Sequence, residues 1–333
     1  MTFRLGIIGA GFLTDVALSP AVTRLAGVVE LVAVHDINQA NLERMAAAHP
    51  ATVRTSDLDE FFAAGLDAVH VATPNDSHSC YARAALERNV PVLLEKPAAH
   101  KPCSATEIAT SAQRSSAVCV LGYMFKHAPS YQHALHLVRS GRIGRVQAVI
   151  GTYPGWRKTD WHSQRASSGL GCLADLGIYP IATAADLLGT GPTHIEAASW
   201  PPVNAPAADT YAAGTVSYDG GARLQFEVTG VFNNETPYAA GTSQLTIVGD
   251  GGFIQLRGVW NMGWKTTFVV HDRDGWEEQD WDVADVYERQ YRRFIEIVET
   301  GDVPEELSIE RGQHDLQLLH NIATQSSSLA GVR

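Results

Sequence analysis

The chain has 333 residues, 36 acidic residues against 25 Lys and Arg, and a formal net charge of −11 at pH 7. This length is enough for two domains, and the negative charge argues against binding to nucleic acid or to an anionic membrane surface. No segment reaches the ~20 apolar residues of a membrane span, and the N-terminus lacks the basic region and cleavage site of a signal peptide. The four cysteines form no C-x-x-C pair, which predicts a cytoplasmic protein with reduced thiols and no metal site.

The first part of the chain alternates short apolar runs with helical stretches, which is typical of a doubly wound parallel sheet. The predicted strands are Phe3–Ile8, Leu31–His35, a weak one near Thr52–Arg54, Ala68–Ala72, Pro91–Leu94 and Val118–Leu121. The predicted helices are Leu13–Leu25, Gln39–Ala48, a short one from Asp57, His78–Arg88 and Ser104–Arg114. Residues 1–122 therefore form a predicted α/β dinucleotide-binding domain of the Rossmann type.

The pattern changes after Gly122, and residues 123–333 form a predicted second α/β domain that binds substrate. Between about Ile195 and Val270 polar and apolar residues alternate between glycine-rich turns, which predicts an open, mostly antiparallel sheet. A further strand is expected at Val146–Gly151. Four helices are expected at Pro129–Arg139, Gly171–Leu188, Val283–Glu299 and Ile309–Leu329.

A glycine-rich turn follows the first predicted strand. Gly9 and Gly11 lie where the chain turns into a helix near Phe12 and Leu13, which is how a dinucleotide pyrophosphate is held. The match to G-x-G-x-x-G is partial, because Thr14 replaces the third glycine, and such a turn can also be purely structural.

An acid at the end of the second strand strengthens this prediction. Asp36 follows Gly11 by about 25 residues, where a carboxylate accepts hydrogen bonds from both ribose hydroxyls. It would also repel a 2′-phosphate, and no arginine follows directly. The sequence thus favours NAD as cofactor, with NADP as the alternative.

Two further motifs follow later strands of the same sheet. Thr73, Pro74 and Asn75 end the fourth strand, where they either cap the next helix or contact the nicotinamide ribose, with His78 close by. Glu95-Lys96-Pro97 ends the fifth strand, and a lysine beside a bound nicotinamide is a candidate catalyst. We therefore count Thr73, Pro74, Asn75, His78, Glu95 and Lys96 as cofactor-binding candidates.

Several of these segments, taken in order, resemble the glucose–fructose oxidoreductase/inositol dehydrogenase (Gfo/Idh/MocA) family. They are the first glycine turn, Ala72-Thr73-Pro74-Asn75 with His78, Glu95-Lys96-Pro97, Gly169 to Tyr179 and the closing stretch to Ser328. The resemblance implies a Rossmann domain followed by an α/β domain whose sheet forms dimer or tetramer contacts. It also raises the expectation of a cis Lys96–Pro97 bond.

The resemblance implies a catalytic set of Lys96, Asp175 and Tyr179, with tyrosine in place of the usual histidine. Asp175 and Tyr179 are four residues apart, which predicts one helix face. A phenol with a reference pKa near ~10 is a poor base at neutral pH, but a lysine ammonium within ~4–6 Å favours the phenolate. The sequence departs from the family pattern at Leu170, within the glycine run, and at Thr183, where an acid often stands.

The substrate would contact this set and aromatic or basic residues of the second domain. Candidates for substrate binding are Lys96, Tyr123, Tyr153, Trp156, Arg157, Asp175 and Tyr179, with Lys126 and His162 as further polar candidates. Trp161 and Arg165 precede the catalytic helix and are counted with the cofactor site. Each of these residues alone is more often a packing or surface residue, and we interpret His133 and His136 in that way rather than as metal ligands.

The function predicted from these residues is hydride transfer between NAD(P) and a secondary alcohol or ketone of a sugar, cyclitol or related polyol. Two alternatives stay open. One is an enzyme that uses tightly bound NAD transiently, as glycosidase-like or isomerase-like relatives do. The other is a sensor of dinucleotide and sugar without turnover. The expected assembly is a homodimer or homotetramer through the second domain's sheet.

Overall fold

The computed structural model describes residues 2–156, 160–232, 243–258 and 265–328. The chain divides into two compact units. Unit 1 contains Met1–Met124 and Asp285–Gln313, and unit 2 contains Phe125–Ala284 and His314–Arg333. The predicted functional domains, 1–122 and 123–333, stay a prediction, because the packing units change at Met124 and the first also includes a late segment.

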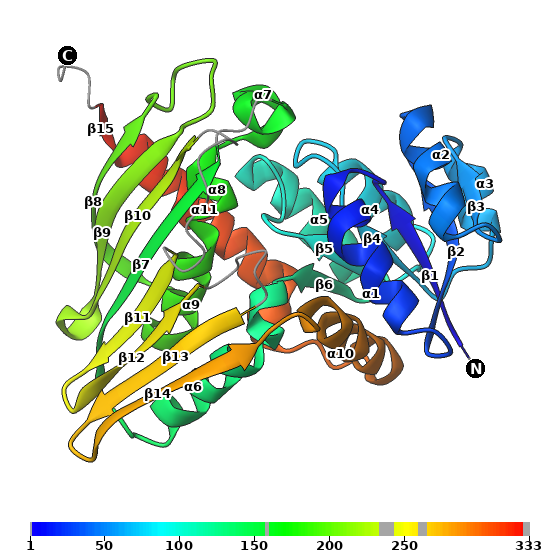
Figure 1. Cartoon of the computed structure of the whole chain (residues 1–333). Helices are drawn as coiled ribbons and strands as arrows, with labels where there is room; N and C mark the ends of the chain where they lie inside the picture. Colours follow the sequence, from blue (N-terminus) through cyan, green and yellow to red (C-terminus); the bar gives the residue numbers. More distant parts are fainter. Residues whose placement is uncertain (1, 157–159, 233–242, 259–264, 329–333) are drawn as a thin grey trace. The chain divides into compact units, whose positions relative to one another are not determined.

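Unit 1 is built on a six-stranded parallel sheet with the strand order β3-β2-β1-β4-β5-β6 (Figure 1). Its strands are β1 (Phe3–Ile8), β2 (Val29–His35), β3 (Val53–Thr55), β4 (Ala68–Val71), β5 (Val92–Glu95) and β6 (Cys119–Gly122). The apolar runs are almost continuous because helices cover both faces of such a sheet. The order reverses between β1 and β4, and ligands of doubly wound sheets bind outside the carboxyl ends of the strands at that point.

Side chains cap the starts of two helices of unit 1. Asn38 accepts a hydrogen bond from the Ala40 N–H at the start of α2 (Gln39–Ala48), and Asp57 accepts bonds from two N–H groups at the start of α3 (Leu58–Ala63). The remaining helices of residues 1–124 are α1 (Ser19–Arg24), preceded by a π-helical turn (Thr14–Leu18), α4 (His78–Leu86) and α5 (Pro102–Arg114). The starts of α2 and α4 agree with the predicted helices, and at α2 and α3 short polar side chains satisfy free N–H groups of the first turn.

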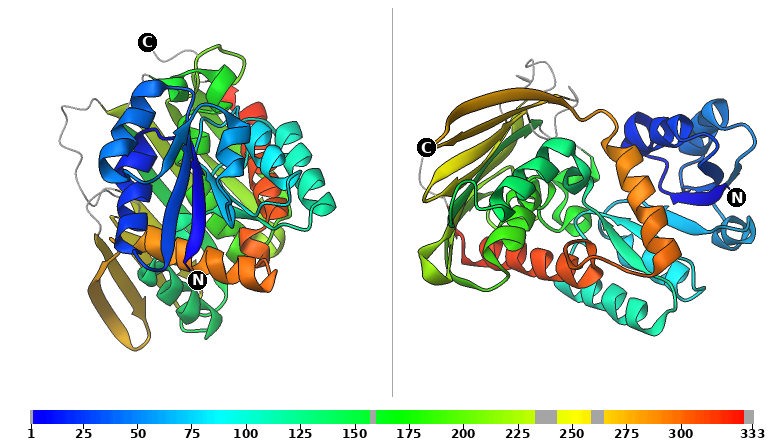
Figure 2. Two further views of the ribbon diagram at one scale, coloured as in Figure 1. Left: turned by 90° about the vertical axis from the view of Figure 1, so that its right-hand side faces the viewer. Right: turned by 90° about the horizontal axis from the view of Figure 1, so that it is seen from below.

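Helix α10 (Val286–Thr300) completes unit 1 although it comes from the end of the chain. It lies beside α1 (Figure 2), where Glu288 forms a 2.6 Å ion pair with Arg24. Its Phe294 ring meets Phe3 of β1 edge to face at 6.4 Å, and the Tyr291 hydroxyl lies 2.9 Å from His70 Nδ1.

Unit 2 is built on a nine-stranded sheet with the order β14-β13-β12-β11-β7-β10-β9-β8-β15. The strands are β7 (Val146–Trp156), β8 (Pro192–Trp200), β9 (Tyr211–Tyr218), β10 (Arg223–Phe232), β11 (Gln244–Gly249), β12 (Gly252–Arg257), β13 (Lys265–Asp272), β14 (Gly275–Asp282) and β15 (Ser327–Ser328). Pairing is antiparallel except between β7 and β10 and between β8 and β15. The predicted mostly antiparallel sheet is confirmed.

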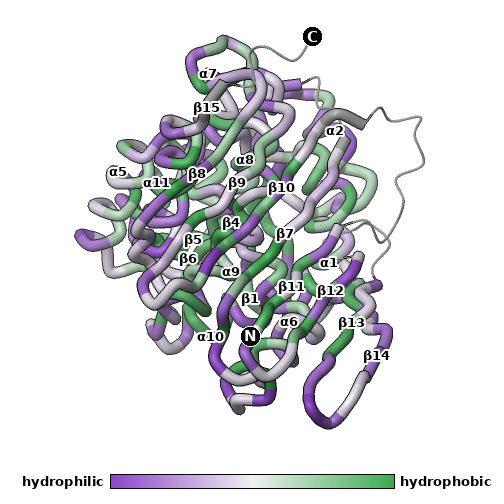
Figure 3. The backbone as a smooth tube through the Cα atoms, turned by 90° about the vertical axis from the view of Figure 1, so that its left-hand side faces the viewer, coloured by the Kyte–Doolittle hydropathy of each residue, from purple (hydrophilic) through white to green (hydrophobic). Residues whose placement is uncertain are grey.

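Helices α6 (Pro129–Arg139), α8 (Cys172–Asp175) and α9 (Ile178–Leu188) pack on one face of this sheet (Figure 2). Val149, Leu224 and Ile254 are buried beneath them. The edge strand β14 is almost entirely exposed and carries Glu277, Glu278 and Asp280. Figure 3 shows hydrophilic residues at the tip of the β13–β14 hairpin, and charge along an edge discourages pairing with another strand.

Two predicted helices differ from the structure. The continuous helix predicted over Gly171–Leu188 is wrong, because α8 ends at Asp175 and the chain bends by 58° before α9. The break falls at Leu176 and Gly177, and a Cβ at Gly177 would lie 2.4 Å from the Leu173 carbonyl oxygen. The closing helix α11 (Ile309–Gln325) ends early, since Ser327 pairs with Ala198 of β8; Leu329 lies outside the described residues.

Candidate active site

The turn after β1 contains two glycines, and the surroundings of their Cα atoms differ. Gly9 has a φ of +101°, and a Cβ at this position would lie 2.5 Å from the Ala72 carbonyl oxygen, so the fold itself requires glycine. A Cβ at Gly11 would meet no atom within 4 Å, and its backbone is not in the left-handed region. The protein gives no internal reason for glycine at this position, which fits the close approach of a ligand to the backbone.

Thr14 explains the incomplete glycine motif. Its buried hydroxyl donates a 2.6 Å hydrogen bond to the Gly9 carbonyl oxygen, so this side chain ties the helix start back to the turn. Phe12, between the turn and this helix, is 70% exposed, and Leu13 follows it directly. The start of this helix is where free N–H groups would meet a pyrophosphate.

Asp36 is buried at the end of β2 and binds the glycine turn directly. Its Oδ2 accepts hydrogen bonds from the Ala10 N–H at 2.7 Å and from Asn41 Nδ2 at 3.0 Å, and Oδ1 accepts one from the Asn38 N–H at 2.7 Å. A carboxylate has about four acceptor positions. Three donors from the protein therefore leave room for a bond from a ribose hydroxyl.

Two residues near Asp36 were not predicted as cofactor contacts. Arg44 on α2 reaches the turn, where its Nη2 lies 3.2 Å from the Ala10 carbonyl oxygen while its Nε binds Asp15 at 2.9 Å. Ile37 is an apolar residue with 84% exposure directly after Asp36. Helix periodicity could have directed attention to Arg44, but no local motif marks it.

The loops after β4 and β5 are joined to each other. The fully buried His78 ring lies 3.0 Å from the Thr73 carbonyl oxygen through Nε2 and 3.0 Å from the Pro97 carbonyl oxygen through Nδ1. The His100 N–H donates to the Asn75 carbonyl oxygen at 3.2 Å. Burial lowers the pKa of His78. Both of its nitrogens face protein carbonyls, so its contribution here is to connect the two loops.

Lys96 stands at the start of the second of these loops, and Lys96–Pro97 is a cis bond as expected. The preceding Glu95 is buried, and its Oε1 lies 3.3 Å from His70 Nε2. Burial raises the pKa of Tyr291, the other neighbour of His70, well above its usual value. The Glu95 carboxylate therefore points toward buried groups of unit 1.

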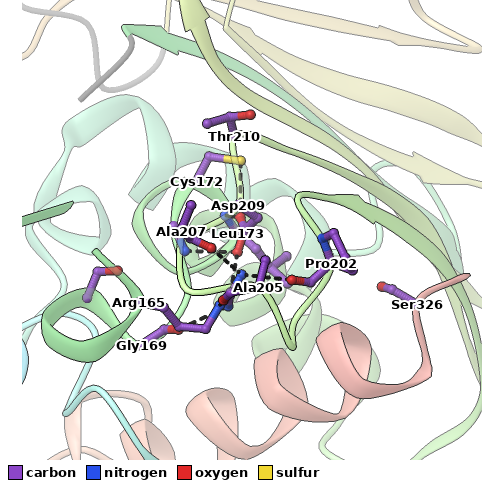
Figure 4. A network of polar contacts seen from close by, with 12 residues as sticks. Arg165, Gly169, Cys172, Leu173, Pro202, Ala205, Ala207, Asp209, Thr210 and Ser326 are labelled. Atoms are coloured by element: carbon purple, nitrogen blue, oxygen red, sulfur yellow. Dashed lines mark hydrogen bonds and ion pairs between the residues drawn. The ribbon is translucent and has the colours of Figure 1, made fainter. Parts of the chain in front are cut away.

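Asp175 is the last residue of α8, a short helix that Asp209 caps (Figure 4). Asp209 Oδ2 accepts from the Gly171 N–H at 2.9 Å, and Oδ1 accepts from the Leu173 N–H at 2.8 Å and the Cys172 thiol at 3.3 Å. A Cβ at Gly171 would lie 1.9 Å from the Asp209 carbonyl oxygen, so this second glycine of the run is required by packing.

Arg165 anchors the same region (Figure 4). Its guanidinium donates to the carbonyl oxygens of Ala205 at 2.9 Å, Gly169 at 3.1 Å and Ala207 at 3.1 Å, and lies 3.9 Å from Asp209 Oδ2. Burial lowers its pKa. These bonds hold the segment before α8 in place, and a contact between Arg165 and the cofactor stays a prediction.

Tyr179 is the second residue of α9 and is 8% exposed. Its ring lies 5.3 Å from Phe125, edge to face, and 5.6 Å from Tyr153. Asp175 and Tyr179 lie on separate helices, so the prediction of one shared helix face is wrong. The Thr183 hydroxyl donates a 2.9 Å bond to the Tyr179 carbonyl oxygen.

The other predicted substrate residues come from both units. Tyr123 in unit 1 and Tyr153 in unit 2 are almost fully buried. Trp161 stacks on His162 at 3.6 Å, and the His162 ring lies 2.6 Å from Asp160. Trp156 ends β7, and Arg157 lies outside the described residues.

Comparison with known proteins gives the family. A family described as "Oxidoreductase family, NAD-binding Rossmann fold" matches residues 3–123, and a "GFO/IDH/MocA C-terminal domain" matches residues 131–255. The chain belongs to the Gfo/Idh/MocA oxidoreductase family. The two matches confirm the resemblance seen in the sequence.

Curated relatives of this family member are moderately similar. It is 27% identical to the rhizopine catabolism protein MocA of Rhizobium meliloti over 59% of this chain and 61% of that protein. It is 26% identical to D-xylose 1-dehydrogenase (NADP(+)) 2 of Haloferax volcanii over 72% of each chain. It is 30% identical to a dTDP-3,4-didehydro-2,6-dideoxy-alpha-D-glucose 3-reductase of Saccharopolyspora spinosa over 59% of each. The matched region thus spans less than two thirds of two of these three proteins.

Solved structures share the whole fold. The 3-ketoreductase KijD10 of Actinomadura kijaniata, in complex with NADP and TDP-benzene, has a TM-score of 0.84 at 19% identity and covers 98% of this chain and 99% of its own. Levoglucosan dehydrogenase in complex with NADH has a TM-score of 0.83 at 18% identity and covers 98% and 97%. At this identity the likeness shows the fold.

In the part of the chain that the structure describes, no single helix combines the length and apolar character that a membrane span requires. One pair of helical segments, Arg165–Asp175 and Ile178–Leu188, meets that criterion only when taken together, across a bend of 58°. No three His, Cys, Asp or Glu side chains among the described residues are grouped so that they could hold a metal ion.

Proposed function

We propose that this protein is an NAD(P)-dependent oxidoreductase that transfers a hydride between nicotinamide and a secondary alcohol or ketone of a sugar, cyclitol or related polyol. One observation carries the proposal. The loop with Lys96 is joined through His78 to the loop after β4, at the sheet edge where the Gly9–Gly11 turn lies. This arrangement supports a lysine beside the nicotinamide end of a dinucleotide whose pyrophosphate lies over Gly11.

The residues present fit the cofactor. The open space at Gly11 suits a phosphate, the remaining acceptor position of Asp36 suits a ribose hydroxyl, and the exposed Ile37 suits an adenine face. When bound, the nicotinamide accepts or supplies the hydride. Thr73, Pro74, Asn75 and Lys96 would surround its ribose.

Residues of the protein would transfer the hydroxyl proton of the substrate. Tyr179 would take the hydroxyl proton of the alcohol during oxidation and return it during reduction. The Lys96 ammonium would stabilise the phenolate form of Tyr179 and donate a hydrogen bond to the substrate oxygen. Asp175, at the end of α8, would orient Lys96 or a substrate hydroxyl.

The substrate class comes from the relatives. Their names include a xylose dehydrogenase, inositol 2-dehydrogenases and a dTDP-sugar 3-reductase. We extend this class to the present chain as sugars and cyclitols, with Tyr123, Tyr153, Trp156 and Arg157 as candidate contacts. We also propose a homodimer or homotetramer through the sheet of unit 2.

For the cofactor we propose NAD ahead of NADP. The buried Asp36 carboxylate would repel a 2′-phosphate. Arg44 is the nearby cation that could favour one, but its Nε is engaged by Asp15 at 2.9 Å. Relatives with either dinucleotide exist, since KijD10 is in complex with NADP and levoglucosan dehydrogenase with NADH.

The test is a screen for reduced nicotinamide absorbance with NAD and NADP in parallel, against aldoses, inositols, sugar phosphates and nucleotide sugars. Turnover on one class, lost in Lys96→Met and retained in Lys101→Met, supports the proposal, because Lys101 is an exposed lysine on the same loop. Full turnover in Lys96→Met refutes the assignment. Dinucleotide that survives purification without net turnover would point instead to transient use of the cofactor or to a sensor.

A further inference from the structure

Unit 2 contains a buried ion pair next to the helix that begins with Tyr179. Lys126 Nζ lies 2.8 Å from both carboxylate oxygens of Asp186, and the two side chains are only 3% and 6% exposed. Lys126 follows β6 in a short 3₁₀ turn (Met124–His127), and Asp186 lies on α9. The sequence suggested Lys126 as a substrate contact, but the structure places it inside unit 2.

Hydrogen bonds connect this ion pair to the first turn of α9. The Tyr131 hydroxyl lies 3.2 Å from Asp186 Oδ2 and 3.3 Å from Thr183 Oγ1. Thr183 in turn donates to the Tyr179 carbonyl oxygen at 2.9 Å. Tyr131 and Thr183 are fully buried, and burial together with Asp186 raises the pKa of Tyr131 well above its usual value. Tyr131 is therefore a neutral link between the ion pair and the Tyr179 backbone.

The aromatic rings make a second connection. The Phe125 ring meets both Tyr131 at 5.1 Å and Tyr179 at 5.3 Å, edge to face in each case. Lys126 Nζ lies 5.9 Å from the centre of the same Phe125 ring. The Phe125 ring thus neighbours both the Lys126 ammonium and the Tyr179 ring in a buried region, where the effective dielectric constant is low.

Thr183 stands where an acid is often found in the family. Its hydroxyl is used by Tyr179 and Tyr131, which places it in the hydrogen-bond chain rather than among groups that would exchange a proton with substrate. The buried charge on α9 is one turn later, at Asp186. A buried ion pair is weak evidence for stability, because desolvating both charges offsets their attraction. A role in the site is the better explanation for keeping one here.

We propose that Lys126 and Asp186 are positioning residues for Tyr179: through Tyr131, Thr183 and Phe125 they hold the first turn of α9, and their balanced charges set the electrostatic potential at the Tyr179 ring. This inference rests on the proposed function, in which Tyr179 exchanges the substrate proton. Other titratable or charged groups on the elements around Tyr179 include Tyr153 on β7, Tyr131, His133, His136 and Arg139 on α6, His127 in the 3₁₀ turn, Cys172 and Asp175 on α8, and Arg223 and Glu227 on β10.

The balance of charge between Lys126 and Asp186 predicts the direction in which each substitution shifts the pH profile. Asp186→Asn leaves the Lys126 ammonium unbalanced, which favours a phenolate at Tyr179, so the acid limb of the pH profile for alcohol oxidation moves to lower pH. Lys126→Met leaves the Asp186 carboxylate unbalanced and moves the limb to higher pH. Each shift is expected to be about one pH unit. The double variant Lys126→Met/Asp186→Asn is expected to return close to the wild-type profile.

The connecting residues give milder variants that keep both charges. Thr183→Val and Tyr131→Phe preserve shape and remove one hydroxyl each, and we expect Thr183→Val to lower kcat about 3- to 10-fold with little change in KM. The control is an exposed ion pair, Arg293 with Glu296 on α10, whose variants Arg293→Met and Glu296→Gln should leave the profile unchanged.

The experiment measures the pH profiles of these variants and, separately, titrates the Tyr179 phenol by NMR with ring-labelled tyrosine, using Tyr179→Phe to assign the signal. Opposite shifts for Asp186→Asn and Lys126→Met support the proposal. Shifts of the same sign, or none, overturn it, as does an unchanged kcat in Thr183→Val. If Tyr179→Phe retains full turnover, the proposed function fails instead, and the titration still reports whether the ion pair acts on the phenol.

Discussion

The Asp36→Asn substitution tests whether one buried carboxylate organises the nucleotide turn. Wild-type Asp36 accepts two backbone N–H bonds of 2.7 Å, one on each oxygen, from Ala10 and Asn38. An amide replaces one oxygen with an NH₂ group. In either orientation of the new amide side chain, one of these backbone donors must face another donor.

The magnitude follows from that loss. A hydrogen bond to a charged group contributes about 1.5–3 kcal/mol, and a buried donor left without an acceptor costs about 1–3 kcal/mol. We expect the free energy of unfolding to fall by about 2–3 kcal/mol. Because the ribose acceptor is weakened as well, we expect the Kd for NAD to rise about 30-fold, which corresponds to about 2 kcal/mol. The Kd for NADP should rise less, because the repulsion of its 2′-phosphate is removed.

Urea denaturation measures the stability, and calorimetric titration with NAD and NADP measures the two affinities. The control is Asp59→Asn, since the Asp59 side chain is 85% exposed and its substitution should change stability by less than about 0.5 kcal/mol. The reasoning is refuted if Asp36→Asn matches this control in stability and binds NAD within about threefold of wild type, about 0.65 kcal/mol.

Further predictions concern capping, pH and thiols. Asp209→Asn removes one of the bonds that start α8, and urea melts should show a loss of about 2–3 kcal/mol; a loss below about 0.5 kcal/mol would contradict the capping role. Burial lowers the pKa of His78, so the unfolded chain binds the proton first and stability declines as the pH falls below about 6.5. His78→Gln should flatten this decline by up to about 1.4 kcal/mol per pH unit, and equal slopes in urea melts from pH 7 to 5 would argue against it. Iodoacetamide should label the exposed Cys80 and Cys103, whereas Cys119, whose pKa burial raises to about 12, should react only after unfolding; peptide mass spectrometry distinguishes these results.

Much of unit 1 could be predicted because its signals are local. Apolar strands such as Phe3–Ile8 are followed by glycine turns, and helices such as Gln39–Ala48 begin at capping side chains. The parallel order of the strands then brings Gly11, Asp36 and Lys96 to one edge of the sheet. Each step uses a pattern of a few residues.

The parts that were predicted wrongly depend on distant residues. The break between α8 and α9 was missed because the apolar pattern continues through Leu176 and Gly177, while the Asp209 cap that starts α8 is 38 residues from Gly171. The partner of Lys126 is 60 residues away at Asp186. Sequence spacing shows which side chains can share a helix face. It does not show which two buried charges, far apart in the chain, form an ion pair.

The composition of unit 1 from two separate segments has a consequence for protein synthesis. Residues 1–124 leave the ribosome long before Asp285–Gln313. The packing of α10 on the rest of unit 1 therefore forms only late in synthesis. Until then His70 has no Tyr291 beside it and Phe3 lacks the Phe294 ring. The nascent nucleotide-binding unit is therefore incomplete until nearly the whole chain has been translated, and a fragment cut at residue 122 would expose the surface that α10 covers.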